Sequence, residues 1–366
     1  MVGSSDPPQE LADRSFERIL LVKPSSLGDV IHALPVLHAL REHYPHARID
    51  WLISSSIAPL LEGHEKLNDL LLFDRKQLGR FGRGVGPTKD LIRFVREIRS
   101  RRYDLVIDLQ GLLRSGLMAW ASGAKVRVGF KSAREGAAML YTHCIDDPDS
   151  HAVDRNMGVG KLLGWGDTVA CFGFPLARPV RSDTRQWLSE LGIVGDEHLV
   201  VVAPGARWET KVWPWDRFAE VINALHGRNE VHCLLIGSRD EVPLCERVAA
   251  QCGRPPINLA GQTSLPQLAA IVSLADLVLC HDSASMHLAV ALDRPLVCIT
   301  GPTNPIRTGP YHRLEDVVRV DLACSPCYLR QLSQCRHDHR CMQELAVANV
   351  LSSIERRLLE PVRQFE

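Results

Sequence analysis

The chain alternates short apolar runs with longer stretches in which apolar residues recur at helical spacing, and this alternation extends through most of its 366 residues. The pattern is typical of parallel sheets that are covered by helices on both faces. The runs form two series, separated by a segment rich in Pro, Arg and Gly at residues 171–182. We therefore predict an α/β chain of two doubly wound halves. The expected strands are residues 19–22, 49–53, 70–73, 105–108 and 126–130 in the first half and 199–203, 231–236, 277–280 and 296–300 in the second.

The length of the chain suits about two domains, each with its own core. We expect a flexible N-terminal extension over residues 1–17, a first domain over 18–175, a second domain over 176–342, and a C-terminal helix within 343–366 that packs back toward the first domain. Sheets of this kind bind ligands at the carboxyl ends of their strands. Two such domains facing each other would leave a cleft that is lined by loops from both.

Positive and negative charges are balanced, with 43 Lys and Arg against 43 Asp and Glu, so the composition gives no sign of a nucleic-acid partner. Residues 75–102 are an exception, because they hold ten basic residues against two acidic ones, Asp90 and Glu97. Such a segment is either a solvated helix face or a patch that meets an anionic partner. Residues 1–17 are polar, and no later run approaches ~18 consecutive apolar residues. We therefore expect a cytoplasmic protein.

Four of the eleven cysteines cluster near the C-terminus with the spacing C-x2-C-x7-C-x5-C, and two histidines lie between the last two of them. This spacing is compatible with a small zinc knuckle, although its gaps are longer than those of the usual zinc patterns. The alternative is a loop of reduced thiols, which we expect because other cysteines lie in strand-like runs typical of a reduced core. The clustered residues are Cys324, Cys327, Cys335 and Cys341.

A carboxylate, Asp29, follows the first expected strand at the start of an amphipathic stretch, residues 30–42. Gly28 can adopt the backbone angles of a tight strand-to-helix turn, and Ser26 offers a hydroxyl and a backbone N–H at the start of the helix. Asp29 therefore has two interpretations. It stabilises the helix dipole, which is the commoner role of such a residue, or it is a catalytic group at the carboxyl end of the sheet.

A lysine, Lys211, stands in the second half shortly after the expected strand 199–203 and just before Pro214, which marks a helix start. An ammonium group in this position can reach a phosphate, while backbone N–H groups bind further oxygens. Taken alone, Lys211 is better explained as a solvated side chain beside structural tryptophans.

Two later strand-to-helix junctions of the second half also carry polar or small residues. Asp282 and Ser283 follow the strand 277–280, and His287 lies one helical turn beyond Ser283 on the same face. Gly301 belongs to a small-residue turn after the following strand. Packing alone does not readily explain three such junctions, which together predict a site for a nucleotide diphosphate.

Three common enzyme classes lack their motifs in this chain. There is no G-x-x-x-x-G-K-[ST] sequence, which disfavours a P-loop nucleotidase, and no G-x-G-x-x-G follows the first strand, which disfavours a nicotinamide dehydrogenase. The G-x-S-x-G sequence of many hydrolases is missing as well.

Six segments of the sequence carry a resemblance to a known family. They are K-P-S-S-L-G-D-V-I-H-A-L-P (23–35), Y-D-L-V-I-D-L-Q-G-L-L-R-S (103–115), S-A-R-E (132–135), H-A-V-D-R-N (151–156), T-K-V-W-P (210–214) and D-S-A-S-M-H-L-A (282–289). Together they resemble the lipopolysaccharide core heptosyltransferases of glycosyltransferase family nine, which have two Rossmann-like domains in the GT-B arrangement. The Q-G, S-A-R-E and H-A-V-D-R segments are most similar to heptosyltransferase I within that family.

The resemblance implies transfer of heptose from ADP-heptose to a Kdo sugar on lipid A, with inversion at the anomeric carbon and with neither a metal ion nor a cofactor. Asp29 would be the general base for the acceptor hydroxyl, and Lys211 would balance charge on the leaving diphosphate. Asp282 would hold the heptose hydroxyls, and His287 would contact the phosphate or the sugar. The implied partner is an anionic lipid or saccharide acceptor at the inner face of the cytoplasmic membrane, and we expect a monomer. The implied donor-binding residues are Ser26, Gly28, Thr210, Lys211, Asp282, Ser283, Ala284, His287 and Gly301, and the implied acceptor-binding residues are Arg114, Arg134 and Arg155.

One residue departs from the family pattern, because Ala284 stands where D-[ST]-G-x-x-H has a glycine. A Cβ in that turn would narrow the approach of a phosphate or change the choice of donor. Three alternatives therefore stay open: a family member with another nucleotide sugar or acceptor, a nucleotide-sugar epimerase of the same two-domain architecture, and a non-catalytic protein that binds a nucleotide sugar or a lipid.

Overall fold

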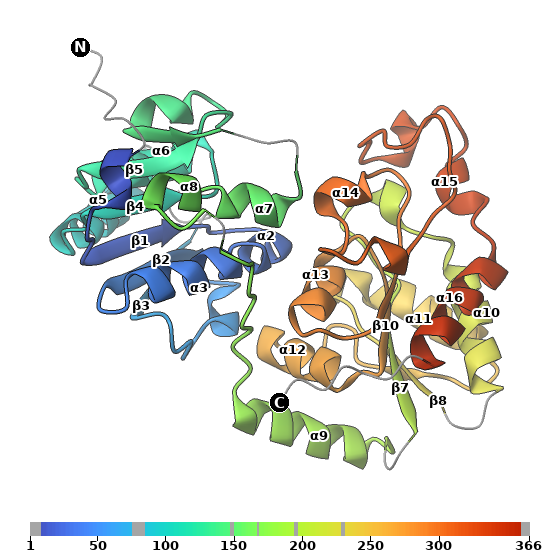
Figure 1. Ribbon diagram of the computed structural model, residues 1–366. Coiled ribbons are helices and arrows are strands. Elements are labelled where there is room, and N and C mark those ends of the chain that lie inside the picture. Colours follow the sequence, from blue (N-terminus) through green and yellow to red (C-terminus); the bar gives the residue numbers. More distant parts are fainter. Residues whose placement is uncertain are drawn as a thin grey trace. The chain divides into compact units, whose positions relative to one another are not determined.

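The structure is a computed structural model of the chain, and it describes residues 9–74, 85–146, 150–166, 168–193, 197–227 and 231–359. The chain divides into two compact units, Met1–Pro175 and Leu176–Glu366, and each unit has its own parallel sheet (Figure 1). The predicted α/β class is confirmed. No helix in the described part of the chain is both long and apolar enough to cross a membrane.

The first unit is built on a six-stranded parallel sheet in the order β3-β2-β1-β4-β5-β6. The strands are β1 (Arg18–Val22), β2 (Arg48–Ser54), β3 (Asp69–Phe73), β4 (Leu105–Asp108), β5 (Val126–Phe130) and β6 (His143–Ile145). All five expected strands form. The sixth, β6, is not among the expected strands, because a run of three residues is too short to show a periodicity.

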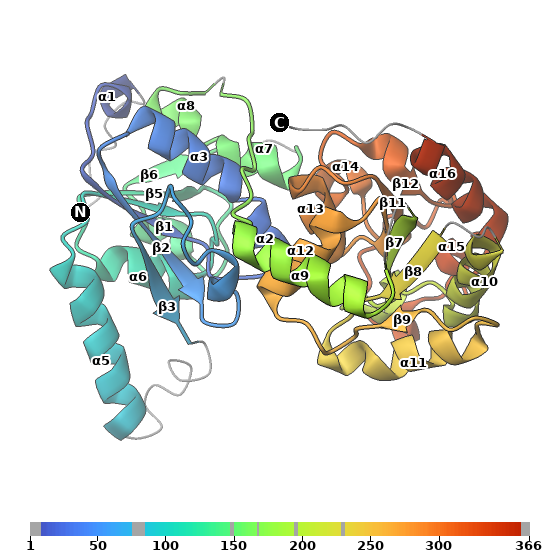
Figure 2. The same cartoon turned by 90° about the horizontal axis from the view of Figure 1, so that it is seen from below.

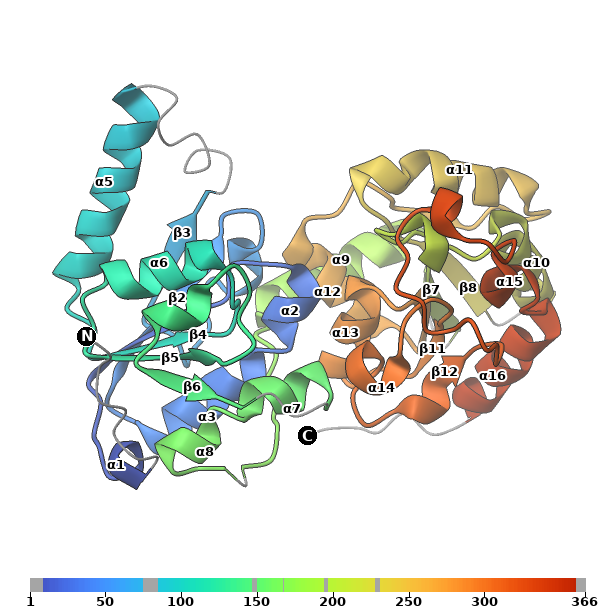
Figure 3. The same cartoon turned by 90° about the horizontal axis from the view of Figure 1, so that it is seen from above.

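Helices cover both faces of the first sheet. They are α1 (Gln9–Ala12), α2 (Leu27–Ile31), α3 (Leu34–His43), α5 (Val85–Ser100), α6 (Leu113–Ala121), α7 (Ala152–Met157) and α8 (Gly160–Leu163), with 3-10 turns η1 (Ala58–Leu60) and η2 (Ala137–Leu140). Figure 3 shows α5 and α6 on one side of the sheet and α3 and α8 on the other. On the α5 and α6 side, Phe94, Ile98 and Met118 pack with the strand residues Leu20 and Val106.

Two parts of the first unit differ from the expectation. The amphipathic stretch 30–42 is divided between α2 and α3, since Pro35 fits the first turn of a new helix but cannot donate a hydrogen bond inside a continuing one. Residues 9–17, expected as part of a flexible extension, are packed: α1 lies there, and Leu11 and Phe16 are buried. Residues 1–8 lie outside the described residues.

The second unit has a six-stranded parallel sheet in the order β12-β11-β10-β7-β8-β9. The strands are β7 (His198–Ala203), β8 (Val231–Leu235), β9 (Ile257–Asn258), β10 (Leu277–His281), β11 (Leu296–Ile299) and β12 (Val317–Val318). The four expected strands form. The two edge strands, β9 and β12, have two residues each and leave no recognisable pattern in the sequence.

The helices of the second unit also lie on both faces of its sheet. They are α9 (Arg178–Glu190), α10 (Trp215–His226), α11 (Val242–Gln251), α12 (Leu265–Leu274), α13 (Ala284–Ala291), α14 (Pro305–Thr308), α15 (Arg340–Gln343) and α16 (Val347–Leu359), with the 3-10 turn η3 (Glu209–Lys211). In Figure 2, α9 and α12 lie on one side of this sheet and α10 and α16 on the other. Since α9 begins at Arg178, the expected linker 171–182 is partly helical.

The C-terminal helix α16 belongs to the core of the second unit. Its buried residues Val350 and Ile354 join a cluster with Trp213, Phe218 and Ile299, and the helix packs on α10 and on strands β10, β11 and β12. The buried face of α16 is therefore covered by the second unit, whereas we expected this helix to pack back toward the first domain. Residues 360–366 lie outside the described residues.

Candidate active site

Asp29 lies at the carboxyl end of the central strand β1, in the first turn of α2. The backbone N–H and the hydroxyl of Ser26 both donate to Asp29 Oδ2, at 2.8 and 2.7 Å. Gly28 lies within α2 and does not have a positive φ, so the expected tight-turn role is wrong and the turn is made by the residues before the helix. The side chain of Asp29 is 45% exposed, so the carboxylate stabilises the helix start and also remains accessible.

The Asp29 carboxylate is held in its ionised form. Partial burial alone would raise its pKa, but the Lys23 ammonium, whose Nζ lies 3.8 Å from Asp29 Oδ1, and the two hydrogen bonds from Ser26 bring that pKa below its usual value. The group is therefore a proton acceptor throughout the neutral range.

Lys23 is a site residue that the sequence analysis did not single out. It directly follows β1, is almost fully buried, and donates from Nζ to the carbonyl oxygen of Leu109 at 2.7 Å. Burial lowers its pKa, while the nearby Asp29 and Asp108 carboxylates oppose that shift. A lysine directly after an apolar strand and six residues before a candidate base was the available signal.

Asp108 is a second buried carboxylate near Lys23, at the carboxyl end of β4. It accepts hydrogen bonds from the Tyr141 hydroxyl at 2.7 Å and from the backbone N–H groups of Gln110 and Gly111 at 2.9 and 3.2 Å. Burial raises its pKa, although these hydrogen bonds act in the opposite direction. Its hydrogen bonds show that Asp108 shapes the turn after β4, and its negative charge favours the ionised form of the buried Lys23.

The three expected acceptor-binding arginines lie in the first unit, two at the starts of helices and one in the loop after β5. Arg134 donates from its backbone N to the Gly111 carbonyl at 2.9 Å, and thereby joins its loop to the turn that precedes Arg114 on α6. Arg155 on α7 lies over the Phe130 ring at 3.9 Å and donates to Ser132 Oγ at 3.2 Å. Arg114 and Arg134 are exposed and Arg155 is half-buried. The three guanidinium groups are suited to bind carboxylates or phosphates.

In the second unit, Lys211 in η3 is bound to Asp282, which follows β10. Lys211 Nζ donates to the carbonyl oxygen and to Oδ2 of Asp282, at 2.9 Å in each case, and it lies 4.6 Å from the centre of the Trp208 ring. Asp282 Oδ2 also accepts from Thr303 Oγ1 at 2.6 Å and Thr308 Oγ1 at 3.3 Å. Thr303 belongs to the same expected small-residue turn as Gly301, whereas Thr308 was not expected at the site. Together they leave Oδ1 as the oxygen of Asp282 that can accept a further hydrogen bond.

Ser283 caps the N-terminus of α13, directly after Asp282. Its Oγ is buried, and it has no hydrogen-bond partner within the described part of the chain. Ala284 is the first residue of the helix. His287 lies one turn later, and its backbone N–H donates to the Ser283 carbonyl oxygen at 3.4 Å. A buried hydroxyl without a partner at a helix N-terminus is placed to donate to an anionic oxygen.

His281, which we did not predict as a site residue, connects the Lys211 loop to strand β10. Its Nε2 accepts from the Trp213 backbone N–H at 2.9 Å, and its Nδ1 lies 3.3 Å from the Gly205 carbonyl oxygen, which fixes both ends of the Lys211 loop against β10. Burial lowers the pKa of His281 to about 4. The ring is therefore neutral, with its proton on Nδ1.

Two of the expected donor-binding residues contact the segment that carries the clustered cysteines. Thr210 is buried, donates from Oγ1 to the Leu329 carbonyl at 2.5 Å and accepts at its own carbonyl from His339 Nε2 at 2.8 Å. A Cβ on Gly301 would lie 2.9 Å from Cys341 Sγ. Both residues thus support the segment 324–341 that carries the clustered cysteines.

The four clustered cysteines line one small cavity of about 180 Å³ in the second unit. All are free thiols, and no three His, Cys, Asp or Glu side chains within the described ranges are arranged as ligands of a metal ion. Burial and the neighbouring thiols of Cys327 and Cys335 raise the pKa of Cys341 to about 11. The segment packs against the Lys211 loop through the Thr210 contacts described above.

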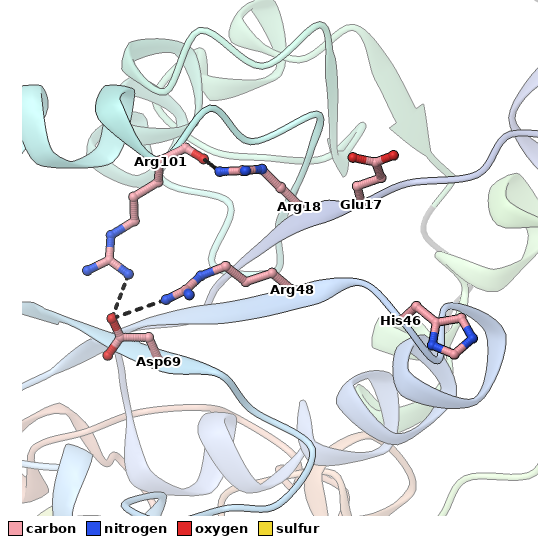
Figure 4. A pocket seen from close by; sticks show the side chains of 6 residues that line it. All are labelled: Glu17, Arg18, His46, Arg48, Asp69 and Arg101. Carbon is pink, nitrogen blue, oxygen red and sulfur yellow. Dashed lines mark hydrogen bonds and ion pairs between the residues drawn. The ribbon is translucent and has the colours of Figure 1, made fainter.

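A larger cavity, of about 730 Å³, opens at the amino ends of β1, β2 and β3, away from Asp29 (Figure 4). Three of its charged side chains form ion pairs: Arg101 Nη1 lies 2.7 Å from Asp69 and 3.0 Å from the buried Asp50, and Arg48 lies 3.5 Å from Asp69. These ion pairs join strands and α5, so this end of the basic segment 75–102 has a structural role. Residues 75–84 lie outside the described residues.

Comparison with known proteins shows the family of the chain. A family model described as glycosyltransferase family 9 (heptosyltransferase) matches residues 91–336. The lipopolysaccharide heptosyltransferase 1 of Pseudomonas aeruginosa is 30% identical, over 85% of this chain and 86% of that protein. The lipopolysaccharide heptosyltransferase 3 of Escherichia coli K12 is also 30% identical, over 78% and 82%. The solved structure of E. coli heptosyltransferase WaaC with ADP is similar with a TM-score of 0.73, at 24% identity over 93% of this chain and 99% of that one. Because this heptosyltransferase 1 and this heptosyltransferase 3 are both 30% identical to the chain, sequence identity does not assign it to either type.

Proposed function

Because the chain belongs to glycosyltransferase family 9, the heptosyltransferases, we propose that it transfers heptose from ADP-heptose to a Kdo sugar of a lipid A type acceptor, with inversion at the anomeric carbon and without a metal ion. That the chain is a glycosyltransferase follows from the family. The donor, the acceptor and the stereochemistry are the proposal. The observation that carries it is the accessible and ionised carboxylate of Asp29 at the carboxyl end of the central strand.

The first step of the proposed reaction takes place at Asp29. Its Oδ2 is held by Ser26, so Oδ1 is the oxygen that would accept the proton of the acceptor hydroxyl. The hydroxyl oxygen would form its bond to the anomeric carbon as the bond from that carbon to the diphosphate oxygen breaks. Attack opposite the leaving group inverts the anomeric centre. A positioned base typically contributes ~10²- to 10⁴-fold to the rate.

The departing diphosphate would be bound by the second unit. Lys211 supplies a positive charge, and the Ser283 hydroxyl with the N-terminus of α13 supplies hydrogen-bond donors. Asp282 Oδ1 would accept from a heptose hydroxyl, and His287 would contact the phosphate or the sugar. The ADP in the solved E. coli relative supports a nucleoside diphosphate as the leaving group.

The acceptor would bind to the first unit. Kdo sugars carry carboxylates, and Arg114, Arg134 and Arg155 lie on segments of the first unit that the loop after β5 connects by hydrogen bonds. Guanidinium groups bind carboxylates and phosphates with two parallel hydrogen bonds, which would orient the acceptor hydroxyl toward the base.

The test combines a donor screen with two variants of Asp29. The full chain is incubated with ADP-heptose, or with UDP- and GDP-sugars, and with Kdo-lipid A, and the products are read by mass spectrometry. We expect a heptosylated product from ADP-heptose only. Turnover of the donor sugar without acceptor would instead indicate an epimerase, and the absence of both reactions would indicate a binding protein.

The two variants separate the base from the helix cap. Asp29→Asn keeps an oxygen that can accept the Ser26 hydrogen bonds but loses the base, whereas Asp29→Ala loses both. We expect transfer to fall ~10²- to 10⁴-fold in both variants, while ADP binding measured by calorimetry is retained. An Asp29→Asn variant with wild-type activity would show that Asp29 is only a cap.

A further inference from the structure

Helix α6 presents an unusual face to solvent. Leu113, Leu117 and Trp120 follow one another at spacings of four and three residues along one side of the helix, and they are 40%, 43% and 60% exposed. The opposite side, with Met118 and Ala119, is buried on the sheet. The exposed side of a surface helix is ordinarily polar. We refer to Leu113, Leu117 and Trp120 as the α6 stripe.

Neighbouring elements extend the α6 stripe. The turn η2 packs directly on α6, because a Cβ on Gly116 would lie 3.1 Å from Leu140 Cδ1, and η2 carries Met139, which is 85% exposed. On the other side, α5 packs beside α6 and carries Ile92, which is 44% exposed. Five large apolar side chains thus lie exposed on adjoining elements on one side of the first sheet, as Figure 3 shows for the two helices. Large apolar side chains that gather exposed on adjoining elements indicate an interaction surface.

Basic residues predominate on the elements that carry this patch, which also include the acidic Glu135, whose Oε2 accepts from the Leu113 backbone N–H at 3.2 Å. The Nε of Arg99 lies 3.8 Å from the Cβ position of Gly123, which places the α5 arginine beside the end of α6. The two acidic residues of α5 already form ion pairs within that helix and its end, Asp90 with Arg93 at 3.3 Å and Glu97 with Arg101 at 3.0 Å. The exposed basic residues of the region are Lys89, Arg93, Arg96 and Arg99 on α5, Arg114 on α6, and Lys131 and Arg134 in the loop after β5.

The combination identifies the partner by its chemistry. We propose that the α6 stripe and the basic side of α5 form a docking surface for an anionic lipid bilayer, with Leu117 and Trp120 inserted at the level of the headgroups. Tryptophan is enriched at membrane interfaces, and a helix with one apolar side and basic flanks lies in the plane of the interface. Arginine and lysine are attracted to anionic headgroups. A second copy of the chain fits less well, because a symmetric pair would bring two basic rims together.

Docking would hold the proposed acceptor-binding arginines at the lipid surface. Arg114 directly follows Leu113 of the α6 stripe, so a lipid-anchored sugar acceptor would lie next to the docked helix. This consequence rests on the proposed function. The docking itself does not, and it is therefore measured with vesicles alone, without donor or acceptor.

The experiment is co-sedimentation of the full chain with large vesicles of equal parts phosphatidylglycerol and phosphatidylcholine, and with vesicles of phosphatidylcholine alone. We expect binding to the anionic vesicles that weakens with salt. The variant Leu117→Glu/Trp120→Glu is expected to lower the partition coefficient about tenfold or more. The matched control is Leu359→Glu, which changes an 85% exposed leucine near the end of α16 and is expected to bind like the wild type.

A second variant separates the electrostatic contribution. Arg96→Gln/Arg99→Gln is expected to lower binding to anionic vesicles about fivefold for each residue, with no change on phosphatidylcholine. If the double glutamate variant does not fold, as judged by circular dichroism, Trp120→Gln takes its place. The proposal is overturned if the wild type binds neither vesicle, if the stripe variants bind as the wild type does, or if size-exclusion chromatography shows that the stripe variants convert a dimer to a monomer.

Discussion

Replacing Lys23 by methionine tests whether a buried ammonium keeps the Asp29 carboxylate ionised. The two side chains are 3.8 Å apart, and Lys23 also donates to the Leu109 carbonyl. Methionine has a similar length and no charge, so the variant removes the favourable charge interaction while largely filling the same space. We expect the pKa of Asp29 to rise and the transfer activity to fail at a higher pH than in the wild type.

The size of the shift can be estimated from the distance. Two unit charges at 3.8 Å interact by about 4 kcal/mol at an effective dielectric constant of roughly 20. Because nearly half of the Asp29 side chain is exposed, solvent screening reduces this to about 1–2 kcal/mol, or about one pKa unit. In the folded wild type the pKa is below its usual value, so the carboxylate is ionised at all pH values above that range. Without Lys23 the burial that opposes ionisation is no longer balanced.

The assay is the pH dependence of kcat/KM, whose acid limb reports the free enzyme's base. Titration of the substrates is common to both proteins, so the difference between them belongs to the enzyme. We expect the acid limb of Lys23→Met to lie about one pH unit higher than that of the wild type. The control is Lys161→Met, which removes an exposed ammonium on α8 and should leave the limb unchanged. An unchanged acid limb in a folded Lys23→Met protein would refute the electrostatic role of Lys23.

Three further predictions concern the second unit. Ser283→Ala removes a buried hydroxyl without a described partner, so the free protein should keep its stability within about 0.5 kcal/mol, while calorimetry should show weaker ADP binding. Burial lowers the pKa of His281 to about 4 in the folded protein, whereas in the unfolded chain the histidine keeps its ordinary pKa of about 6.5. As the pH falls below about 6.5, the unfolded chain therefore takes up a proton that the folded protein does not. Urea unfolding should therefore show stability lost between these two values, by up to about 3 kcal/mol, and His281→Gln should flatten that loss. Gly301→Ala places a Cβ 2.9 Å from Cys341 Sγ, and thermal unfolding should show a loss of about 1–3 kcal/mol.

Sequence periodicity predicted the strands that define both sheets, because each of them is an apolar run of four or more residues. It also predicted which junctions carry Asp29, Lys211 and Asp282, since these follow the carboxyl ends of recognisable strands. The short strands β6, β9 and β12 could not be predicted, because pairing with a neighbouring strand, and not their own pattern, defines them.

Side-chain direction in the turns was not predictable in the same way. Thr210 precedes Lys211 and was assigned to the donor with it, yet its hydroxyl bonds the Leu329 carbonyl, 119 residues later in the chain. Whether Thr210 or Lys211 is buried depends on where the segment 324–341 packs in the folded unit, which the local sequence does not show. Thr303 and Thr308, conversely, reach Asp282 from the residues that follow β11, and no sequence pattern shows which group their hydroxyls contact.

The two interpretations of Asp29 are compatible, because the carboxylate has two oxygens with different surroundings. Oδ2 accepts both hydrogen bonds from Ser26, which is the capping interaction that the simpler interpretation requires. Oδ1 lies 3.8 Å from the Lys23 ammonium, longer than a hydrogen bond, and thus retains the capacity to accept a proton from a substrate hydroxyl. The cap fixes the orientation of the base before substrate binds, which lowers the cost of positioning it in the transition state. A helix start is for this reason a suitable support for a catalytic carboxylate, and Asp29→Asn separates the two roles that Asp29→Ala removes together.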